Sequence, residues 1–439
     1  MTLERFIETA RANGRFDRVI EVCIARAPGR LDVMGGIADY SGSLVLQRPT
    51  AEATWAAFQP VDRKGIRVIS LGDPPRTATL EFDQRIEYRQ ARERFTGNDA
   101  VRWTAYLAGV ILVLARERGI SIRGGNLFIS SSVPEAKGVA SSAALEVATM
   151  NAVCGALNVG LQPHEVAVFC QMAENLVAGA PCGIMDQMTA ACGEEDALLA
   201  LLCQPAELQA PVKVPEEVRF WGIDSGERHA VSGSDYGSVR CGAFMGFRMI
   251  AGNDKSGVDY VANISVDEFE RSYGGALPDE ISGAEFLRRY SGTADSVTTV
   301  DPARVYKIRQ PTAHPVYEHR RVREFRDLLL RSCSEAELRR LGELMYQSHS
   351  SYSACGLGSR GTDMIVDLVR AAGPKKGLYG ARITGGGSGG TVAVVGGAGS
   401  DRSVADIVEQ YANATGYRPH VFSGSSPGAC RFGVHRVRL

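Results

Sequence analysis

The chain has 439 residues, of which 44% are hydrophobic and 23% are charged, and its formal net charge is -1. This length exceeds one ordinary hydrophobic core and predicts two domains of normal globular composition. The near-neutral charge argues against general binding to nucleic acid or to an anionic membrane surface. The opening residues, MTLERFIETARANGRF, contain no apolar run typical of a secretory signal, so we expect a cytoplasmic protein.

Residues 20–130 are expected to form mainly strands, with one helix. RVIEVCIARAPG alternates and stops at Pro28-Gly29, which is typical of a strand that ends in a turn. ATWAAFQPV, IRVISL and GNLFIS also favour strands. Residues 100–118 carry an apolar helical stripe and a basic last turn, which predicts a helix. Its apolar run, Leu107 to Ala115, is about half the length needed to span a bilayer.

A loop of small residues, SSVPEAKGVAS, leads into the next predicted helix, which we place from Ser142 onward. Gly138, Ser141 and Ser142 lie where the loop becomes a helix, and free backbone N–H groups and the helix dipole favour a phosphate there. The alternative is ordinary capping of the helix by Ser141 or Ser142. The chain contains no G-x-x-x-x-G-K-[ST] sequence, so any phosphate binding does not come from a P-loop.

The second half of the chain is expected to mix helices and strands. A helix is predicted over Pro163 to Val177, followed by strands in DALLALLCQP and EVRFWGIDS. We place the domain boundary near residue 205, which gives domains 1–205 and 206–439. Residues 250–300 are polar and are interpreted as mixed helix and loop. EHRRVREFRDLLLRS and EAELRRLGELMYQSHSSY have the pattern of helices.

The glycine-rich stretch TGGGSGG, Thr384 to Gly390, fits both G-x-G-x-x-G and G-x-S-x-G. A dinucleotide fingerprint must open a helix, and a nucleophile elbow must be a strand-to-helix turn. The following residues, TVAVVGG, favour a strand, so both interpretations fail on context. The alternatives are a tight hairpin and a loop that approaches a ligand closely. Ten cysteines are spread along the chain without a C-x-x-C pair, which argues against a zinc site or redox dithiol.

Three segments together resemble the motifs of the GHMP small-molecule kinases. They are RAPGR (Arg26 to Arg30), PEAKGVASSAALEVA (Pro134 to Ala148) and RITGGGSGGTVAVV (Arg382 to Val395). AENLVAGAPCGIMDQM (Ala173 to Met188) looks like the sugar-binding and catalytic segment of galactokinases, and DSGERHAVSGSDYGSVR (Asp224 to Arg240) resembles a further galactokinase segment. DVMGGIADYSGSLVLQ, FWGIDSG, YSACGLGS and GSSPGA resemble the L-arabinokinase type. The resemblance covers the chain from about residue 20.

This resemblance implies an α+β chain with the GHMP kinase fold. The N-terminal domain would be of the ribosomal-protein-S5-like type, and the C-terminal domain would be ferredoxin-like. The active site would lie in the cleft between the two domains. The implied activity is phosphoryl transfer from ATP to a sugar hydroxyl, which needs a positioned acceptor, charge neutralisation at the γ-phosphate and usually a base.

The resemblance implies that Asp186 is the carboxylate that faces the anomeric hydroxyl and that Arg30 lies beside it. The Arg30 cation would keep Asp186 ionised and stabilise negative charge that develops during transfer. Without the motif, a helix-capping Asp and a surface salt bridge would be the ordinary interpretations of these two residues. Whether Asp186 takes the proton or only orients the hydroxyl is left open.

The same resemblance implies binding sites for ATP and Mg²⁺. Ser142 and Glu174 are the expected Mg²⁺ ligands, because this hard ion prefers oxygen ligands and keeps several waters. Ala140 stands where the family usually has a serine, which removes one hydroxyl but keeps the backbone donors. Trp103 and Tyr106 would lie near the adenine, although core packing explains them equally well. The residues expected to hold the triphosphate are Gly138, Val139, Ala140, Ser141, Ser142 and Ala143.

For the sugar, Asp39 would accept hydrogen bonds from ring hydroxyls, Tyr236 would give a further contact, and Gly183 would allow close approach beside Asp186. Gly386 would help to shape the site. Galactokinases usually have Glu-His where this chain has Gly36-Ile37, toward the exocyclic hydroxymethyl of galactose. L-Arabinopyranose has the same ring hydroxyl pattern without that group, so removal of Glu-His removes the penalty against it.

The expected function is therefore an ATP-dependent sugar-1-kinase that acts on L-arabinose. The alternatives are a galactokinase and a catalytically silent sensor of sugar and ATP that acts through a partner protein. The joint presence of Arg30, Ser142, Glu174 and Asp186 argues against the silent sensor. The sequence does not indicate the oligomeric state.

Overall fold

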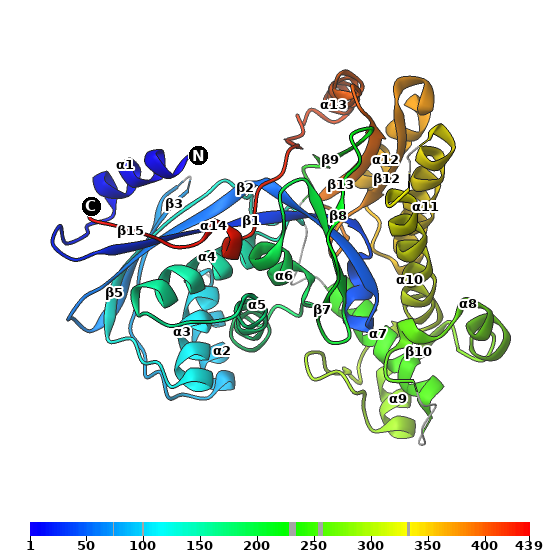
Figure 1. Ribbon diagram of the computed structural model, residues 1–439. Coiled ribbons are helices and arrows are strands. Elements are labelled where there is room, and N and C mark those ends of the chain that lie inside the picture. The colour runs from blue at the N-terminus through cyan, green and yellow to red at the C-terminus, as the bar shows by residue number, and fades with distance from the viewer. Residues whose placement is uncertain (73, 99–100, 228–233, 253–257, 332–333) are drawn as a thin grey trace.

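The computed structural model describes residues 1–72, 74–98, 101–227, 234–252, 258–331 and 334–439. They form two large sheets with helices packed on them and one small sheet of two strands, and the predicted α+β class is confirmed (Figure 1). No helix in these ranges is both long and apolar enough to cross a lipid bilayer. Every cysteine in them is a free thiol.

The first sheet has the strand order β15-β1-β2-β5-β3-β4, and β6 joins it through β2. Its pairs are antiparallel except β3 with β5. β7 (Glu207–Leu208) and β8 (Val212–Lys213) pair with β6. The remaining strands are β1 (Val22–Met34), β2 (Leu44–Pro60), β3 (Gly65–Leu71), β4 (Arg76–Leu80), β5 (Gly124–Ser131), β6 (Ala197–Leu202) and β15 (His435–Val437).

Helices α2 to α6 lie together on one face of this sheet, and α1 (Leu3–Asn13) lies on the opposite face (Figure 1). The first face buries a continuous apolar core, which includes nearly the whole length of α3. On the opposite face, Phe6 of α1 stacks on Trp55, with ring centroids 5.2 Å apart. The helices are α2 (Tyr88–Thr96), α3 (Thr104–Arg118), α4 (Ser141–Ala156), α5 (Pro163–Met172), α6 (Met185–Cys192) and α14 (Ala429–Phe432).

The second sheet is antiparallel and has the order β12-β13-β9-β14, from β12 (Leu378–Ile383), β13 (Thr391–Gly397), β9 (Val218–Asp224) and β14 (Val421–Phe422). Alternate side chains of a strand point to opposite faces of a sheet. Val392 and Val394 accordingly pack against α12 (Arg360–Ala372) and α13 (Asp401–Thr415). Ala393 and Val395 instead face α10 (Arg309–Leu329) and α11 (Glu335–Cys355).

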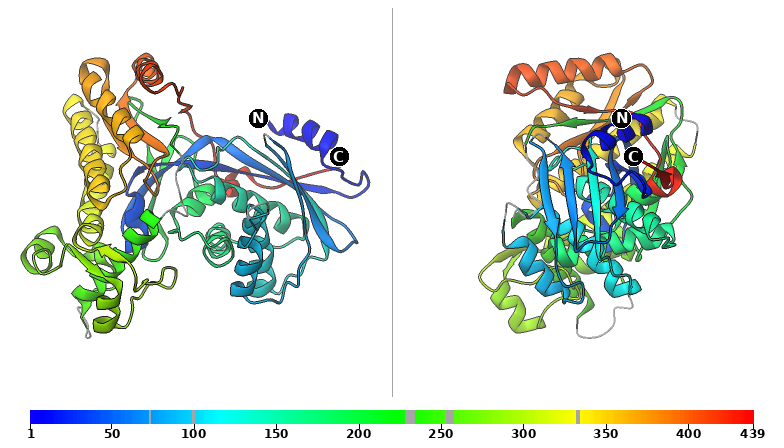
Figure 2. Two further views of the ribbon diagram at one scale, coloured as in Figure 1. Left: turned by 180° about the vertical axis from the view of Figure 1, so that it is seen from behind. Right: turned by 90° about the vertical axis from the view of Figure 1, so that its left-hand side faces the viewer.

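A smaller lobe precedes α10 and has a core of its own. The lobe corresponds to the segment interpreted as mixed helix and loop, and it also contains short strands. Its elements are α7 (Ser234–Ala251), α8 (Val266–Glu268), β10 (Glu280–Ser282), α9 (Gly283–Tyr290) and β11 (Val305–Lys307), with a 3₁₀ turn at Val261–Asn263 and a π turn at Phe269–Tyr273. Figure 2 shows this lobe beside the helices of the second sheet.

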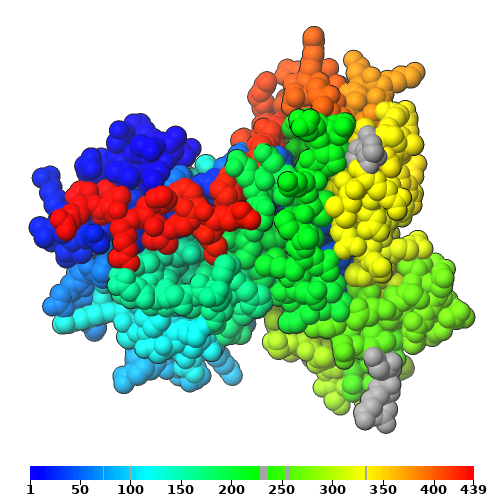
Figure 3. All heavy atoms as spheres, in the orientation of Figure 1, coloured from blue at the N-terminus to red at the C-terminus, as the bar shows by residue number. Residues whose placement is uncertain are grey.

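The two sheets share one apolar core. Leu31 and Val33 of β1 pack with Phe220 of β9 and with Phe325 of α10. The chain also crosses back, because β15 pairs with β1 after the second sheet is complete. The space-filling view shows these last residues lying on the N-terminal half (Figure 3). The boundary near residue 205 remains a prediction, with β7 and β8 pairing on β6 beyond it.

Two helices differ from the sequence prediction at their ends. The helix over Pro163 to Val177 becomes a π turn at Ala173–Ala178, after α5 has ended at Met172. α10 begins at Arg309, well before the predicted EHRRVREF segment, and contains Pro315. Proline inside a helix removes one backbone bond, which is why the sequence favoured a later start. Pro315 is buried in this helix, so packing compensates for the lost bond.

A fully buried ion pair joins the two halves. Nη1 of Arg382 on β12 lies 2.9 Å from Oδ2 of Asp32 on β1, and both side chains are 0% exposed. Asp32 also accepts a hydrogen bond of 2.7 Å from Nε2 of Gln47 on β2. Such a pair is costly to break, because removing one partner leaves the other charge buried without compensation.

Asp32→Asn is expected to lower the free energy of unfolding by about 3 kcal/mol, because the Arg382 cation loses its partner. Urea denaturation of the purified protein measures this change. Glu409→Gln is the matched control, since it breaks the exposed Arg418–Glu409 pair and should cost less than about 1 kcal/mol. Equal losses in the two variants would contradict a structural role of the buried pair.

Candidate active site

Two adjoining cavities lie where the loops of the two halves meet. The larger measures about 780 Å³ and the smaller about 90 Å³. Both are lined by Ala136, Ser141, Ser142, Glu174 and Pro181, so they meet at the start of α4. The small cavity brings together most of the predicted site residues, namely Arg30, Ile37, Asp39, Gly138, Ala140, Ser141, Ser142, Glu174, Gly183, Asp186, Tyr236 and Gly386.

The loop before α4 presents a helix N-terminus to both cavities. Helix α4 begins at Ser141, and Ala140 occupies the N-cap position with a left-handed φ of 60°. The alternative of capping by Ser141 or Ser142 is therefore wrong, since both lie within the first helical turn. The methyl group of Ala140 cannot accept the first N–H groups, and these are left for an anionic ligand.

The same loop is fixed from several sides. The backbone N–H of Arg30 donates to the Val139 carbonyl at 3.0 Å, and Arg30 Nη1 donates to the Gly138 carbonyl at 2.6 Å. Lys137 Nζ lies 2.9 Å from Oδ2 of Asp224 on β9. Ala143 is fully buried behind the loop. The backbone that faces the cavities is thus held by residues of both halves.

Asp186 lies in the first turn of α6 and is held by Arg30 through two bonds. Arg30 Nε donates to Oδ1 at 2.8 Å, and Nη2 donates to Oδ2 at 3.0 Å. The Arg30 side chain is 3% exposed, whereas that of Asp186 is 20% exposed and lines the small cavity. Burial alone would lower the pKa of Arg30, but Asp186 and Asp32 raise it above its ordinary value. Such a bidentate pair fixes the carboxylate in position.

Glu174 lies on the π turn that ends the predicted helix, and it faces Ser142 where the cavities meet. Burial and the nearby Asp186 raise the pKa of Glu174 to about 7, against hydrogen bonds from Ser142, Cys182 and Gln187. Gln187 Nε2 bridges two carboxylates, at 2.5 Å from Oε2 of Glu174 and 3.3 Å from Oε2 of Glu146. Single π turns often occur at functional sites.

Glu146 is a buried carboxyl group that the sequence analysis did not select. It is 0% exposed, and its Oε1 atom has no hydrogen-bond partner within the described residues. Burial and the neighbouring Glu174 raise its pKa well above the ordinary value. A neutral Glu146 beside Glu174 limits the negative charge that the interior must carry. Glu146 lies among apolar residues of the predicted helix, so the sequence pattern did not mark it as a residue of the site.

Asp39 closes the small cavity from the opposite side. Its Oδ1 accepts a hydrogen bond of 2.6 Å from the backbone N–H of Tyr40. A Cβ atom at residue 183 would lie 1.7 Å from Oδ2 of Asp39, so Gly183 is required for this approach. The sequence analysis had placed the close approach of Gly183 beside Asp186. Burial and Asp186 raise the pKa of Asp39 to about 7, against the lowering effect of Arg240.

Arg240 of α7 supports this part of the site from the small lobe. It forms a bidentate pair with Asp295 at 2.8 and 2.9 Å and donates to the Cys182 carbonyl at 3.1 Å. Its guanidinium lies 5.3 Å from the ring centroid of Tyr40. Tyr236, one turn earlier on α7, packs edge-on against Tyr40. Within the Asp224 to Arg240 motif, residues 228–233 lie outside the described residues.

The two residues of the MGGIADY loop that replace Glu-His have different surroundings. Ile37 lines the small cavity. Gly36 faces away from it, since a Cβ atom there would lie 1.6 Å from Oη of Tyr352 and 2.8 Å from Oδ2 of Asp32. Its φ of 48° also favours glycine. The space beside Gly36 is therefore occupied by Tyr352 of α11, which sequence reasoning did not identify.

The glycine-rich stretch Thr384 to Gly390 connects β12 to β13. The residues after it form a strand, as the sequence predicted, and not the helix that either motif would need. Gly385 and Gly386 line the small cavity. A Cβ atom at residue 385 would lie 3.1 Å from Nη2 of Arg30. Gly387 instead faces Leu357 and Tyr352. The stretch is thus more than a hairpin, because two of its glycines form a wall of the site.

The large cavity has an aromatic end. Trp103 and Tyr106 line it together with Ile129 and Val133. The guanidinium of Arg76 lies 6.0 Å from the Trp103 ring centroid. Planar aromatic rings and apolar side chains suit a flat heterocycle, and the α4 N-terminus, which also lines this cavity, suits phosphate groups.

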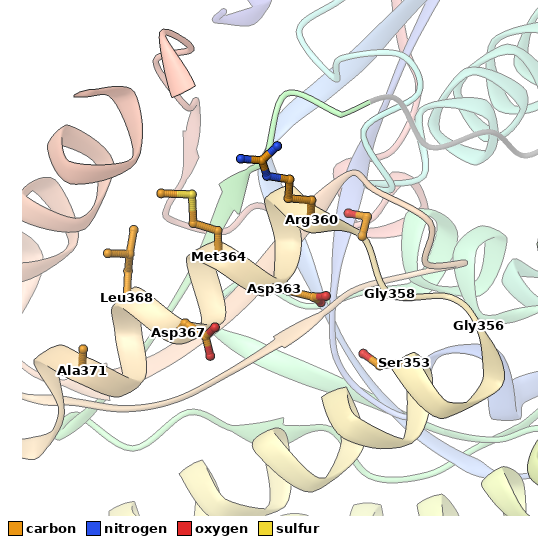
Figure 4. Close-up of a pocket in the computed structure, with 10 residues that line it drawn as sticks. Ser353, Gly356, Gly358, Arg360, Asp363, Met364, Asp367, Leu368 and Ala371 are labelled. Carbon is orange, nitrogen blue, oxygen red and sulfur yellow. The ribbon is translucent and has the colours of Figure 1, made fainter. Parts of the chain in front are cut away.

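A separate open groove of about 960 Å³ runs along α12 and shares no lining residue with the two cavities (Figure 4). Asp363 and Asp367 lie along it, with Met364 and Leu368 on the same helix. Arg360 also lines the groove, so the groove carries charges of both signs.

Comparison with known proteins agrees with these features. The family described as "GHMP kinases N terminal domain" matches residues 105–194, and "GHMP kinases C terminal" matches residues 325–418. An L-arabinokinase of Arabidopsis thaliana is 43% identical over 98% of this chain, which spans about half (48%) of that relative's length. A galactokinase of Chloroflexus aurantiacus is 32% identical over 90% of this chain and 89% of its own.

Solved structures give the same fold. Lactococcus lactis galactokinase complexed with galactose superimposes with a TM-score of 0.75 at 20% identity, covering 100% of both chains. Mevalonate kinase of Methanococcus jannaschii gives a TM-score of 0.59 at 16% identity, covering 92% of this chain and 98% of its own. These likenesses confirm the predicted fold.

The pKa of Asp39 is expected to fall from about 7 in the Asp186→Asn variant, because the Asp186 charge raises it. The remaining burial should keep it above the ordinary value of an aspartate. A ¹³C NMR titration of the carboxyl carbons measures this pKa, and the Asp39→Asn variant assigns the resonance. An unchanged or raised pKa would contradict the close approach of the two carboxylates.

Proposed function

The chain belongs to the GHMP kinases, and from this membership and the geometry of the site we propose that it is an ATP-dependent sugar-1-kinase. Its proposed reaction is phosphorylation of the anomeric hydroxyl of L-arabinose to give L-arabinose 1-phosphate. The observation that carries the proposal is the small cavity, which is lined by both Asp186 and Asp39 and also by the first residues of α4. This arrangement places a hydroxyl-binding pocket next to a phosphate-binding one.

ATP would occupy the large cavity, with its adenine near Trp103 and Tyr106 and its phosphates at the start of α4. The N–H groups of the first turn and the hydroxyls of Ser141 and Ser142 would bind the phosphate oxygens. The γ-phosphate would then lie where the two cavities meet, which directs it toward the small cavity.

The proposed metal is Mg²⁺, held by Ser142 and Glu174. The donor set fits, because the two side chains offer a hydroxyl and a carboxylate oxygen within hydrogen-bonding distance of each other. Burial and the neighbouring Asp186 raise the pKa of Glu174, and a bound cation would favour its ionised form. When bound, Mg²⁺ would neutralise charge on the phosphates.

Asp186 would accept a hydrogen bond from the anomeric hydroxyl and orient its oxygen toward the γ-phosphorus. Since Arg30 holds both carboxylate oxygens, the carboxylate reaches the substrate in one fixed geometry. The Arg30 cation would also stabilise the negative charge that spreads over the transferred group. Asp39 would hold further ring hydroxyls in its ionised form, with Tyr236 beside it.

We propose L-arabinose rather than galactose as the substrate because one wall of the small cavity is apolar. Ile37 lines the small cavity, and an aliphatic side chain offers no hydrogen bond to an exocyclic hydroxymethyl group. The 43% identity to an L-arabinokinase supports the same substrate. The alternative substrate is galactose, favoured by the relatives named galactokinase. A catalytically silent sensor is less well supported, since Arg30, Ser142, Glu174 and Asp186 are all brought together.

A sugar panel tests the proposal directly. ATP-dependent turnover is measured with L-arabinose, D-galactose and other free sugars, and kcat/KM for L-arabinose should exceed that for D-galactose by at least about 10-fold. A higher kcat/KM for D-galactose would replace the proposal by the galactokinase alternative. Sugar binding without turnover would favour the silent sensor.

Asp186→Asn should lower kcat with L-arabinose by at least about 100-fold, because the carboxylate that faces the hydroxyl is lost. Isothermal titration should still detect binding of the sugar, since Asp39 remains. The matched control is Asp406→Asn on the exposed face of α13, which should leave kcat unchanged. Wild-type turnover in Asp186→Asn would overturn the assigned role.

A further inference from the structure

The hydroxyl group of Tyr352 joins two loops that wall the small cavity. Tyr352 lies near the end of α11 and is 0% exposed. Its Oη accepts a hydrogen bond of 2.7 Å from the backbone N–H of Ile37 and donates one of 2.9 Å to the carbonyl of Gly385. Ile37 and Gly385 both line the small cavity. Tyr352, from the second half of the chain, therefore positions two walls of the cavity, one at Ile37 and one at Gly385.

Asp32 also links the same two loops, by accepting hydrogen bonds from their backbone. Its Oδ1 accepts the Gly36 N–H at 3.1 Å, and its Oδ2 accepts the Gly385 N–H at 3.2 Å. Tyr352 and Asp32 thus form four hydrogen bonds that connect the MGGIADY loop to the glycine-rich stretch. Their bonds fix the backbone of Gly36, Ile37 and Gly385.

The Tyr352 ring is held tightly in this position. Its centroid lies 5.1 Å from the Arg382 guanidinium, and the His314 ring packs edge-on against it at 5.1 Å. Burial raises the pKa of Tyr352 well above its ordinary value, so the hydroxyl keeps its proton and remains a donor. A Cβ atom at Gly387 would lie 3.3 Å from the ring. The ring can therefore yield little space to a new neighbour.

The side chain of Tyr352 leaves no space for a side chain at residue 36, which is glycine. A Cβ atom at residue 36 would lie 1.6 Å from Oη of Tyr352, which no packed structure tolerates. The polar side chain that galactokinases carry at this position has no room here, because Tyr352 fills the volume. The substrate preference therefore depends on a residue far along the chain from the loop that differs.

We propose that Tyr352 is a specificity-determining positioning residue: it fills the space beside Gly36 and holds Ile37 and Gly385 as the apolar and backbone walls of a pocket for a five-carbon sugar. This inference rests on the proposed function for the identity of the sugar. It adds that Gly36 and Tyr352 act as a pair, so exchanging Gly36-Ile37 alone does not create a galactose site.

The first test removes the hydroxyl alone. Tyr352→Phe should raise KM for L-arabinose about 10-fold and lower the ratio of kcat/KM for L-arabinose over D-galactose, because Ile37 loses its anchor. KM for ATP should change less than about twofold, since the large cavity does not include these loops. Tyr306→Phe is the matched control, because it removes a buried hydroxyl that accepts from Asp301 in the small lobe. An unchanged sugar ratio in Tyr352→Phe would overturn the proposal.

The second test exchanges the loop residues with and without Tyr352. Gly36→Glu/Ile37→His alone should lose turnover of both sugars, because the new side chain collides with the ring. Adding Tyr352→Leu should restore turnover and favour D-galactose. A gain of galactose turnover in the two-residue variant, with Tyr352 retained, would contradict the pairing. Failure of the three-residue variant to gain any galactose turnover would contradict it as well.

A third measurement does not depend on activity. Gly36→Ala should lower Tm in the wild-type background, and about half or more of that loss should disappear in the Tyr352→Leu background. The residual loss comes from the left-handed backbone strain at residue 36 and from the contact of its Cβ atom with Oδ2 of Asp32. An equal loss of Tm in both backgrounds would contradict the proposed pairing of Gly36 with Tyr352. A wild type that prefers D-galactose would refute the proposed function, while this cycle would still decide whether the two residues interact.

Discussion

The candidate site depends on the placement of one buried cation, Arg30. Its guanidinium binds both oxygens of Asp186 and the carbonyl of Gly138, and its backbone N–H binds Val139. The proposed catalytic carboxylate and the proposed phosphate-binding loop are therefore held by one residue of β1. A rigid strand is a better support than a loop for groups that must meet within a fraction of an ångström.

Several carboxyl groups gather in the part of the site that Arg30 supports. Asp39, Glu146, Glu174 and Asp186 lie in one buried region, and Asp39 and Glu174 have pKa values raised to about 7. Asp186 contributes to both shifts, whereas Arg30 holds it in a bidentate pair. Cations and hydroxyl donors bound in this region would relieve the repulsion between these carboxyl groups.

Local features of the site could be predicted from the sequence, and long-range ones could not. The start of α4 followed from small residues that lead directly into a helical pattern, and Thr384 to Gly390 was correctly placed between two strands. The roles of Arg30, Asp39 and Asp186 came from resemblance and stay predictions. Ile37 and Tyr352 are separated by 315 positions, and no periodic pattern indicates that they touch. The π turn at Glu174 was also missed, because it differs from an α-helix by a single hydrogen-bond register.

The return of the last strand has a consequence for the order in which the molecule can be completed during synthesis. β1, which carries Arg30, pairs on its outer side with His435–Val437, and Arg26 reaches Ser426 across 400 positions. Until those residues leave the ribosome, the outer edge of β1 has no partner from this segment. An unpaired edge attracts other strands, so the edge at Val22–Ile24 stays open to wrong pairing until residues 435–437 have been synthesised.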